Sequence, residues 1–372
     1  MAKLGDIATY INGYAFKPQD WSDEGIPIIR IQDLTGNSYQ ANRYNGEYAS
    51  KYEVNDGDVL ISWSASLGVY IWHGEKAVLN QHIFKVVFDK ERISKDFFVH
   101  QVGLILENAA SDAHGATMKH LTKPVFDALP FYLPPYEKQC EIAEILDKVT
   151  SLISLRKQQL AKLNELVKAR FVEMFGDPVN NPMNYPKSQL GKVCDVRDGT
   201  HDSPEYYDVG YPLVTSKNVT GGKIDLSECN LISEDDYKKI CERSKVDRGD
   251  IIMPMIGTVG KPVIVNTEPM FAIKNVALIK FTPDSLVTNI YIETLLESDY
   301  FDRAVLDKIR GGTQKFIALG DIRKLEIILP DLKHQQCFSA FVERVDQQKQ
   351  TVQQSLEKLK LMKKALMQEY FG

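Results

Sequence analysis

The second half of this chain of 372 residues repeats the first half at an offset of about 190 residues. The segment GIPIIRIQDLTG from Gly25 corresponds to GYPLVTSKNVTG from Gly210, and GDVLISWSASLG from Gly57 corresponds to GDIIMPMIGTVG from Gly249. Further along, GATMKHL from Gly115 corresponds to GGTQKFI, and the matches keep their order. A repeat of this length predicts two structural units with similar folds.

Each repeat begins with short runs rich in β-branched residues and bounded by Gly, Asn or Asp, which predict strands. These strands are expected over 26–31, 58–63 and 82–88, and over 211–216, 250–256 and 275–281. Apolar residues three to four apart predict a helix over 94–108 and another over 289–309, and a last strand ends at Pro134 or Pro330. Each repeat therefore begins with a mixed α/β domain.

Each domain is followed by a long helix with the apolar pattern of a coiled coil, in which residues alternate four and three apart. The helix starts are marked by Pro135 and Asp331, and about 36 residues would give a helix of about 54 Å. The expected apolar seam consists of Ile142, Leu146, Val149, Ile153, Leu160, Leu163 and Val167 in the first helix, and of Phe338, Val342, Val345, Val352, Leu356, Leu359 and Leu366 in the second.

The two seams have equal length and phase, which favours pairing between the two helices of one chain. Because a whole domain connects the helices, the pair can be antiparallel. Pairing between two chains, or packing of each helix on its own domain, is the alternative.

The charge of the chain argues against binding nucleic acid or membranes by bulk charge alone. Lys and Arg number 45 against 50 Asp and Glu, and each predicted domain has four more acidic than basic residues. The balance reverses around a repeated Gly-x-Thr-x-Lys segment, whose glycines, hydroxyl and ammonium group suit contacts with phosphates. Tight turns with solvated lysines are the alternative. The candidate residues are Gly115, Thr117, Lys119 and Lys123, with Arg310, Gly311, Thr313 and Lys315.

The motifs of common enzymes and metal sites are missing from the sequence, which favours a binding protein over a catalyst. Asp236 and Lys238 have the spacing of half a metal-dependent nuclease site, but they lie in a polar stretch that is typical of a solvated helix face. The five cysteines are scattered, and the sequence has no long apolar stretch and no signal peptide pattern. We therefore expect a cytoplasmic protein without disulfides, metal or membrane span.

Two similar but unequal domains held apart by long helices suit a ligand with two separated sites, such as duplex DNA. The repeated pattern L-G-[DK]-[IV], P-[IL]-[IV]-x-[IS], G-D-[VI]-[LI]-[IM], G-[AG]-T-x-K and L-P-[PD], followed each time by a long helix ending in Phe-Gly, resembles the specificity subunits of type I restriction-modification enzymes. The resemblance implies an α+β fold with target recognition domains over residues 1–136 and 177–330. It also implies that helices over 137–176 and 331–372 form an antiparallel coiled coil as a spacer.

The resemblance further implies that each domain recognises one half of a split sequence in double-stranded DNA. The coiled coil would dock two methyltransferase subunits, which use S-adenosylmethionine to methylate adenine. Two restriction subunits, which require ATP and Mg²⁺, would complete the assembly, and this chain itself would bind no cofactor and catalyse no reaction. A scaffold whose two domains bind proteins rather than DNA is the alternative, and an unrecognised nuclease is a further one.

Two more candidate DNA contacts follow matched strands, namely Arg30 and Lys217. The serines Ser62, Ser64 and Ser66 correspond to Met253, Met255 and Gly257 in the second repeat. This difference suits two domains that recognise different sequences. An exposed polar strand face is the alternative interpretation of the serines.

Overall fold

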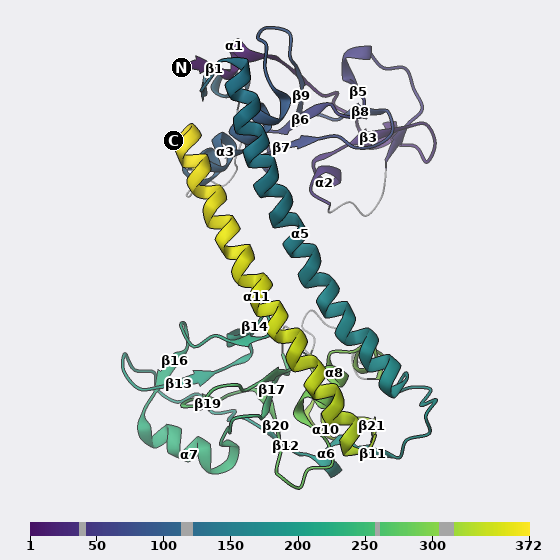
Figure 1. The fold of residues 1–372 in the computed structure, drawn as a ribbon, viewed down its shortest axis with the longest axis vertical. Coiled ribbons are helices and arrows are strands. Elements are labelled where there is room, and N and C mark those ends of the chain that lie inside the picture. Colours follow the sequence, from purple (N-terminus) through teal and green to yellow (C-terminus); the bar gives the residue numbers. More distant parts are fainter. Residues whose placement is uncertain (37–41, 113–121, 257–260, 305–315) are drawn as a thin grey trace. The chain divides into compact units, whose positions relative to one another are not determined.

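The computed structural model describes residues 1–36, 42–112, 122–256, 261–304 and 316–372 (Figure 1). By their contacts the residues form two compact units: unit 1 is Met1–Lys157 with Gln354–Gly372, and unit 2 is Gln158–Gln353. Each unit therefore includes a part of both long helices. The domain boundaries predicted from the sequence place the helices apart from the domains, and they stay a prediction.

Unit 1 is built on two four-stranded sheets (Figure 1). One is antiparallel, with the order β2 (Thr9–Asn12), β9 (Ile83–Val87), β6 (Val59–Ser62) and β7 (Gly68–Ile71). The other has the order β4 (Arg43–Tyr44), β3 (Ile26–Ile29), β8 (Ala77–Leu79) and β5 (Glu53–Val54), with β3 and β8 parallel. The remaining elements are β1 (Ala2–Lys3), which pairs with β10 (Pro130–Phe131), and α1 (Leu4–Ile7), α2 (Ile31–Leu34), α3 (Lys95–Asp112) and α4 (Lys123–Asp127).

Unit 2 repeats this arrangement. Its antiparallel sheet has the order β12 (Asp195–Asp198), β20 (Val276–Lys280), β17 (Ile251–Pro254) and β18 (Val263–Ile264). Its second sheet has the order β16 (Asn230–Ile232), β13 (Tyr211–Val214) and β19 (Ala272–Ile273), with β13 and β19 parallel. The other elements are β11 (Lys187–Gln189) paired with β21 (Glu326–Ile328), β14 (Val219–Thr220) paired with β15 (Lys223–Ile224), α6 (Leu190–Val193), α7 (Glu234–Ser244), α8 (Asn289–Leu296), α9 (Asp299–Ala304) and α10 (Leu319–Lys324). The predicted pair of similar mixed α/β domains is confirmed.

The helix predicted over 289–309 and the strand predicted over 26–31 differ from the structure. The helix predicted over 289–309 is interrupted, because α8 ends at Leu296 and α9 begins at Asp299. Between them, the Ser298 hydroxyl donates to the Leu295 carbonyl at 2.6 Å and the Phe301 N–H donates to the Ser298 carbonyl at 3.0 Å, so the chain turns and restarts. The strand predicted over 26–31 ends at Ile29, because the Arg30 N–H is capped by Asp33 at the start of α2.

The long helices are α5 (Tyr136–Phe175) and α11 (Leu332–Phe371), each of 40 residues. In unit 2 the end of α5 meets the beginning of α11, since the ring centroids of Phe171 and Phe175 lie 5.6 and 5.4 Å from that of Phe338. In unit 1 the Arg156 Nε donates to the Ser355 Oγ at 3.2 Å. The beginning of α5 there shares a core with the end of α11. The helices therefore pair antiparallel within the chain, as predicted.

Most residues of the predicted seam lie in the interior of their unit. Ten are buried and the other four are partly buried; the buried ones are Ile142, Leu146, Val149, Leu163, Val167, Phe338, Val342, Val345, Val352 and Leu356, and the partly buried ones are Ile153, Leu160, Leu359 and Leu366. The seam continues into the core of each domain. In unit 1 Phe371 packs edge-on against Phe97 of α3, and in unit 2 Phe171 stacks on Tyr291 of α8.

A buried glutamine near the start of each long helix joins that helix to its own domain. Gln139 is 1% exposed; its Oε1 accepts from the Ser94 N–H at 2.9 Å and its Nε2 donates to the Pro134 carbonyl at 2.9 Å. Gln335, 196 residues further on, makes the same pair of bonds with Thr288 and Pro330, at 2.9 and 2.8 Å. Both glutamines satisfy backbone groups that would otherwise be buried without a partner. The sequence analysis did not single them out.

We expect Gln139→Met to lower the free energy of unfolding of unit 1 by about 3 kcal/mol, because a buried N–H and a buried carbonyl lose their partner. All three tryptophans, Trp21, Trp63 and Trp72, lie in unit 1, so urea unfolding followed by tryptophan fluorescence measures the effect. The control is Gln354→Met, an exposed position on α11 in the same unit, for which a change within about 0.5 kcal/mol is expected. Equal effects of the two substitutions would contradict the role given to Gln139.

A lysine occupies a seam position in unit 1. Burial lowers the pKa of Lys363, against the opposing influence of the Glu107 and Asp147 carboxylates. Because the folded state holds this proton less tightly than the unfolded state, the charge destabilises the fold at neutral pH. Stability attributable to Lys363 rises as the pH approaches the pKa of an unfolded lysine, about 10.4.

Lys363→Met should therefore raise the free energy of unfolding at pH 7, and the gain over the unsubstituted chain should shrink as the pH is raised toward 10. Urea unfolding at a series of pH values measures this difference. Lys364→Met, at the exposed neighbouring position, serves as the control and should show little change across the series. A gain for Lys363→Met that does not depend on pH would contradict the electrostatic explanation.

Candidate nucleic-acid interface

Three of the predicted DNA contacts, Arg30, Lys123 and Lys217, belong to the part of the chain that the structure describes. The others lie outside the described residues: Gly115, Thr117, Lys119, Arg310, Gly311, Thr313 and Lys315. For these seven, the contact with DNA stays a prediction. The described residues nevertheless define the surfaces at the ends of β3 and β13, which lie just before Arg30 and Lys217.

Arg30 is engaged within unit 1. It is the N-cap residue of α2, and its side chain is 15% exposed. Its guanidinium carbon lies 5.7 Å from the centroid of the Trp21 ring, and its Nε lies 3.6 Å from Asp33 Oδ2. These contacts stabilise the turn after β3.

Lys123 is exposed and begins α4. Its ammonium group lies 2.7 Å from Asp127 Oδ2 and 5.8 Å from the centroid of the Tyr10 ring.

Of the serines, Ser62 and Ser64 are buried, so the interpretation of an exposed polar strand face is wrong for these two. The Ser62 hydroxyl donates to the Ser64 carbonyl at 3.2 Å, which satisfies it inside the unit.

Lys217 is exposed and lies directly beyond the carboxyl end of β13. The parallel strand β19 ends beside the end of β13. There the Lys274 N–H donates to the Val214 carbonyl at 2.9 Å. The loop that follows β12 runs along the same strand end, with the Thr200 N–H donating to the Ile273 carbonyl at 3.0 Å. A Cβ atom on Gly199 would lie 2.3 Å from the Ile273 carbonyl oxygen, so only glycine permits this approach.

A polar cluster holds this loop in place. The His201 Nε2 lies 2.8 Å from Asp198 Oδ2, and its Nδ1 lies 2.8 Å from Asn275 Oδ1. Asp198 also pairs through its other oxygen with the Arg243 guanidinium. Hydrogen bonds to Asn275 and to Asp198 raise the pKa of His201. Burial pushes the pKa of Asp198 upward, but the hydrogen bond to His201 and the charge of Arg243 outweigh it, so this pKa is lowered.

A cavity of about 230 Å³ lies between this loop and α7. Lys239 and Arg243 of α7 line one side, and the exposed loop lines the other; the lining residues are Thr200, Asp202, Ser203, Pro204, Asp236, Lys239, Ile240, Arg243 and Ser244. Lys274 reaches the same loop, with its ammonium 2.6 Å from Ser203 Oγ. We call the loop 199–206 together with Lys217, Lys239, Arg243 and Lys274 the strand-end surface.

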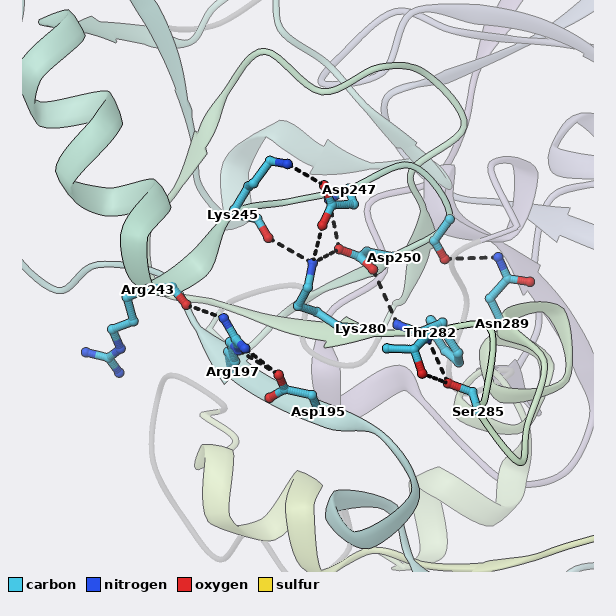
Figure 2. A network of polar contacts seen from close by, with 12 residues as sticks. Asp195, Arg197, Arg243, Lys245, Asp247, Asp250, Lys280, Thr282, Ser285 and Asn289 are labelled. Atoms are coloured by element: carbon cyan, nitrogen blue, oxygen red, sulfur yellow. Dashed lines mark hydrogen bonds and ion pairs between the residues drawn. The ribbon is translucent and has the colours of Figure 1, made fainter.

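Ion pairs of β12 and β20 fix the end of α7 (Figure 2). Arg197 of β12 donates to the Arg243 carbonyl at 2.8 Å and pairs with Asp195. Lys280 of β20 donates to the Lys245 carbonyl at 2.9 Å and pairs with Asp247 and Asp250. Figure 2 shows the guanidinium of Arg243 pointing away from these ion pairs. Its side chain is 65% exposed, so the network positions a charged group at the surface.

Unit 1 has the same backbone framework with different side chains. The Asn80 N–H donates to the Ile29 carbonyl at 3.1 Å, and the Tyr14 N–H donates to the Leu79 carbonyl at 2.8 Å. A Cβ atom on Gly13 would lie 2.0 Å from the Asn80 carbonyl oxygen. The loop after β2 exposes Tyr14 and Trp21, whereas the loop after β12 exposes His201, Tyr206 and Tyr207.

The sequence analysis missed His201, Lys239, Arg243 and Lys274. A signal for His201 was present, because LGDIATYINGYAF from Leu4 matches LGKVCDVRDGTHD from Leu190 and pairs Gly13 with Gly199. Residues that directly follow this shared glycine differ between the repeats. Lys239 lies on α7, beside Lys238, which forms a 2.7 Å ion pair with Glu234 on the helix surface. The expectation of a solvated helix over this stretch agrees with α7.

Among the described residues, no group of three or more His, Cys, Asp and Glu is arranged to bind a metal ion. Within the same residues, none of the helices is long and apolar enough to cross a membrane.

The geometry defines a class of protein: an internally duplicated chain with two similar α/β domains and a pair of antiparallel helices. Residues 1–165 and 182–361 both match the model of the type I restriction modification DNA specificity domain. The chain belongs to this family, the specificity subunits of type I restriction-modification systems, as the sequence patterns predicted.

Relatives and solved structures agree with this assignment. The chain is 23% identical over 378 residues to the type I restriction enzyme EcoBI specificity subunit of Escherichia coli, covering 92% of this chain and 78% of that protein. It is 24% identical over 391 residues to the MjaVIII specificity subunit of Methanocaldococcus jannaschii, covering 99% and 90%. The crystal structure of a type I S subunit from M. genitalium is similar with a TM-score of 0.57 at 13% identity, covering 100% of this chain and 95% of that one. This last similarity supports the fold.

Proposed function

We propose that this chain is the DNA sequence-recognition subunit of a type I restriction-modification complex. Each of its two domains recognises one half of a bipartite target. The observation that carries the proposal is the duplicated framework: the same backbone hydrogen bonds hold the loops after β2 and β12, while the exposed side chains differ. A shared framework with different surface residues suits two domains that recognise different short sequences.

The chain supplies recognition, and its partners supply the chemistry. Two methyltransferase subunits methylate adenine with S-adenosylmethionine, and two restriction subunits use ATP and Mg²⁺. Exposed apolar residues on the long helices support docking of partner subunits there. On α5 in unit 1, Ile145 and Leu152 lie seven residues apart outside the seam and are 39% and 44% exposed, and Leu155 is 58% exposed. On α11 in the same unit, Leu361 and Met362 are 69% and 50% exposed.

The net charge of -5 fits this division of roles. Contacts with phosphates supply most of the affinity of a protein that binds DNA without help. We infer that the partner subunits make many of these contacts, while this chain contributes the contacts that distinguish sequences. DNA binding by the isolated chain is then weak and sensitive to salt.

When the chain is expressed with its methyltransferase subunits, we expect adenine methylation at a two-part motif with a constant gap. Sequencing of methylated bases across the host genome measures this motif. Expression of the methyltransferase subunits alone is the control and should give no such motif. Methylation without a bipartite motif, or an unchanged pattern in the control, would contradict the proposal.

A matched insertion tests whether the helices set the gap. Seven residues added to α5 between Lys157 and Gln158, and seven added to α11 between Gln353 and Gln354, keep both seams in phase. Because seven helical residues span about 10.5 Å and base pairs stack about 3.4 Å apart, the gap should lengthen by at most about three base pairs. The two half-sequences should remain the same. Altered half-sequences with an unchanged gap would contradict the role of the helices.

A further inference from the structure

We propose that unit 2 contacts its half of the DNA target through the strand-end surface, with Lys239 and Arg243 on backbone phosphates and the loop 201–206 on base edges. This inference rests on the proposed function and assigns it to particular residues. Neither the family match nor the predicted Gly-x-Thr-x-Lys segments point to this surface.

Basic side chains gather at the strand-end surface, although the domain as a whole is acidic. Lys217, Lys239 and Arg243 are exposed. Lys274 borders the same loop. Asp198 is buried and is contacted by both His201 and Arg243. The loop also carries Asp202 and Glu205, and Asp236 lines the cavity, so four basic side chains stand beside these three carboxylates.

The second argument is the chemistry of the cavity. Lys239 and Arg243 lie four residues apart, on one face of α7, and both line it. The opposite side carries the hydroxyls of Thr200 and Ser203 and the carboxylate of Asp202, and Asp236 lines the cavity from α7. Ammonium, guanidinium and hydroxyl groups are the side chains that proteins use on DNA phosphates. A volume of about 230 Å³ is large enough to receive a phosphate group, so we assign Lys239 and Arg243 to the backbone.

The third argument concerns the loop itself. His201 and Asp202 are exposed at its beginning, Ser203 follows, and Tyr206 is 51% exposed. Asp202 can accept from the amino group of cytosine, and Ser203 can donate or accept at several base edges. Gly199, the Thr200 backbone bonds and the His201 cluster anchor the beginning of the loop. An anchored loop that presents exposed polar groups suits discrimination between bases.

The ion-pair network at the end of α7 also supports this surface. Arg197 and Lys280 bind the backbone at the end of α7, and so hold Arg243 relative to β12 and β20 (Figure 2). Lys280 is 16% exposed and Asp250 3% exposed, which places this ion pair within the domain, whereas Arg197 and Asp195 are 39% and 49% exposed. Such support reduces the conformational freedom that Arg243 would lose on binding.

Phosphate contact is tested with neighbouring lysines of α7. The purified complex of this chain with its methyltransferase subunits is titrated with a labelled duplex that carries the methylated motif, at several KCl concentrations. Lys239→Ala should weaken binding about fivefold on cognate and unrelated duplexes alike, and should reduce the slope of log affinity against log salt by about 0.9. Lys238→Ala, which removes an exposed lysine paired with Glu234, should leave both unchanged.

Base contact is tested with two aspartates of the same loop region. Asp202→Ala should relax one half of the methylated motif by at least one base pair and leave the other half and the gap unchanged, measured by sequencing of methylated bases. Asp208→Ala, also exposed but away from the cavity lining, should leave the motif unchanged. All four positions are exposed, so the variants are expected to fold.

The outcomes separate this inference from the proposed function. If the unsubstituted chain directs methylation to a bipartite motif, and Lys239→Ala and Asp202→Ala match their controls, the strand-end surface is not the DNA contact and the inference is overturned. If Lys239→Ala weakens assembly with the methyltransferase subunits instead of DNA affinity, the surface binds protein and the inference fails. If no bipartite motif exists at all, the proposed function fails, and this inference fails with it.

Discussion

The antiparallel pairing of α5 and α11 is the interaction on which the structure of each unit depends. In unit 2, Phe171 and Phe175 at the end of α5 pack against Phe338 near the start of α11, and Tyr291 of the domain packs against both residues of α5. In unit 1, Phe371 at the end of α11 packs against Phe97. The helix pair and the domain thus share one apolar core in each unit, so that neither part buries its apolar surface without the other.

The duplication preserves the hydrogen bonds of buried backbone groups rather than the exposed side chains. The buried glutamine at the start of each long helix makes equivalent bonds in both units. The loops after β2 and β12, which begin at Gly13 and Gly199, also make equivalent backbone bonds. These bonds satisfy buried backbone groups, whose number and direction are the same wherever the fold is the same. Exposed side chains on the loops carry no such constraint. They are therefore free to differ between the two domains.

Local sequence patterns predicted some features of this chain and missed others. The fold class and the pairing of the long helices were predicted correctly, because the repeat and the apolar periodicity are visible along the chain. The antiparallel direction came from the family resemblance. The helix over 289–309 was predicted wrongly, because the apolar spacing continues through the turn at Ser298. Of the candidate contacts, Arg30 packs against Trp21, and only the folded chain reveals that neighbour. The predicted contacts outside the described residues remain predictions.

The sequence by itself determined that the chain has two similar α/β domains with long helices, because repeats, β-branched runs and seam spacing are local properties. It also determined the family. Only the tertiary structure decided which polar residues share a surface. Asp198 meets Arg243, which is 45 residues away in the chain, and His201 meets Asn275, which is 74 residues away. The physical reason is that strand pairing and helix packing bring such residues together, and a pattern along the chain contains no record of either.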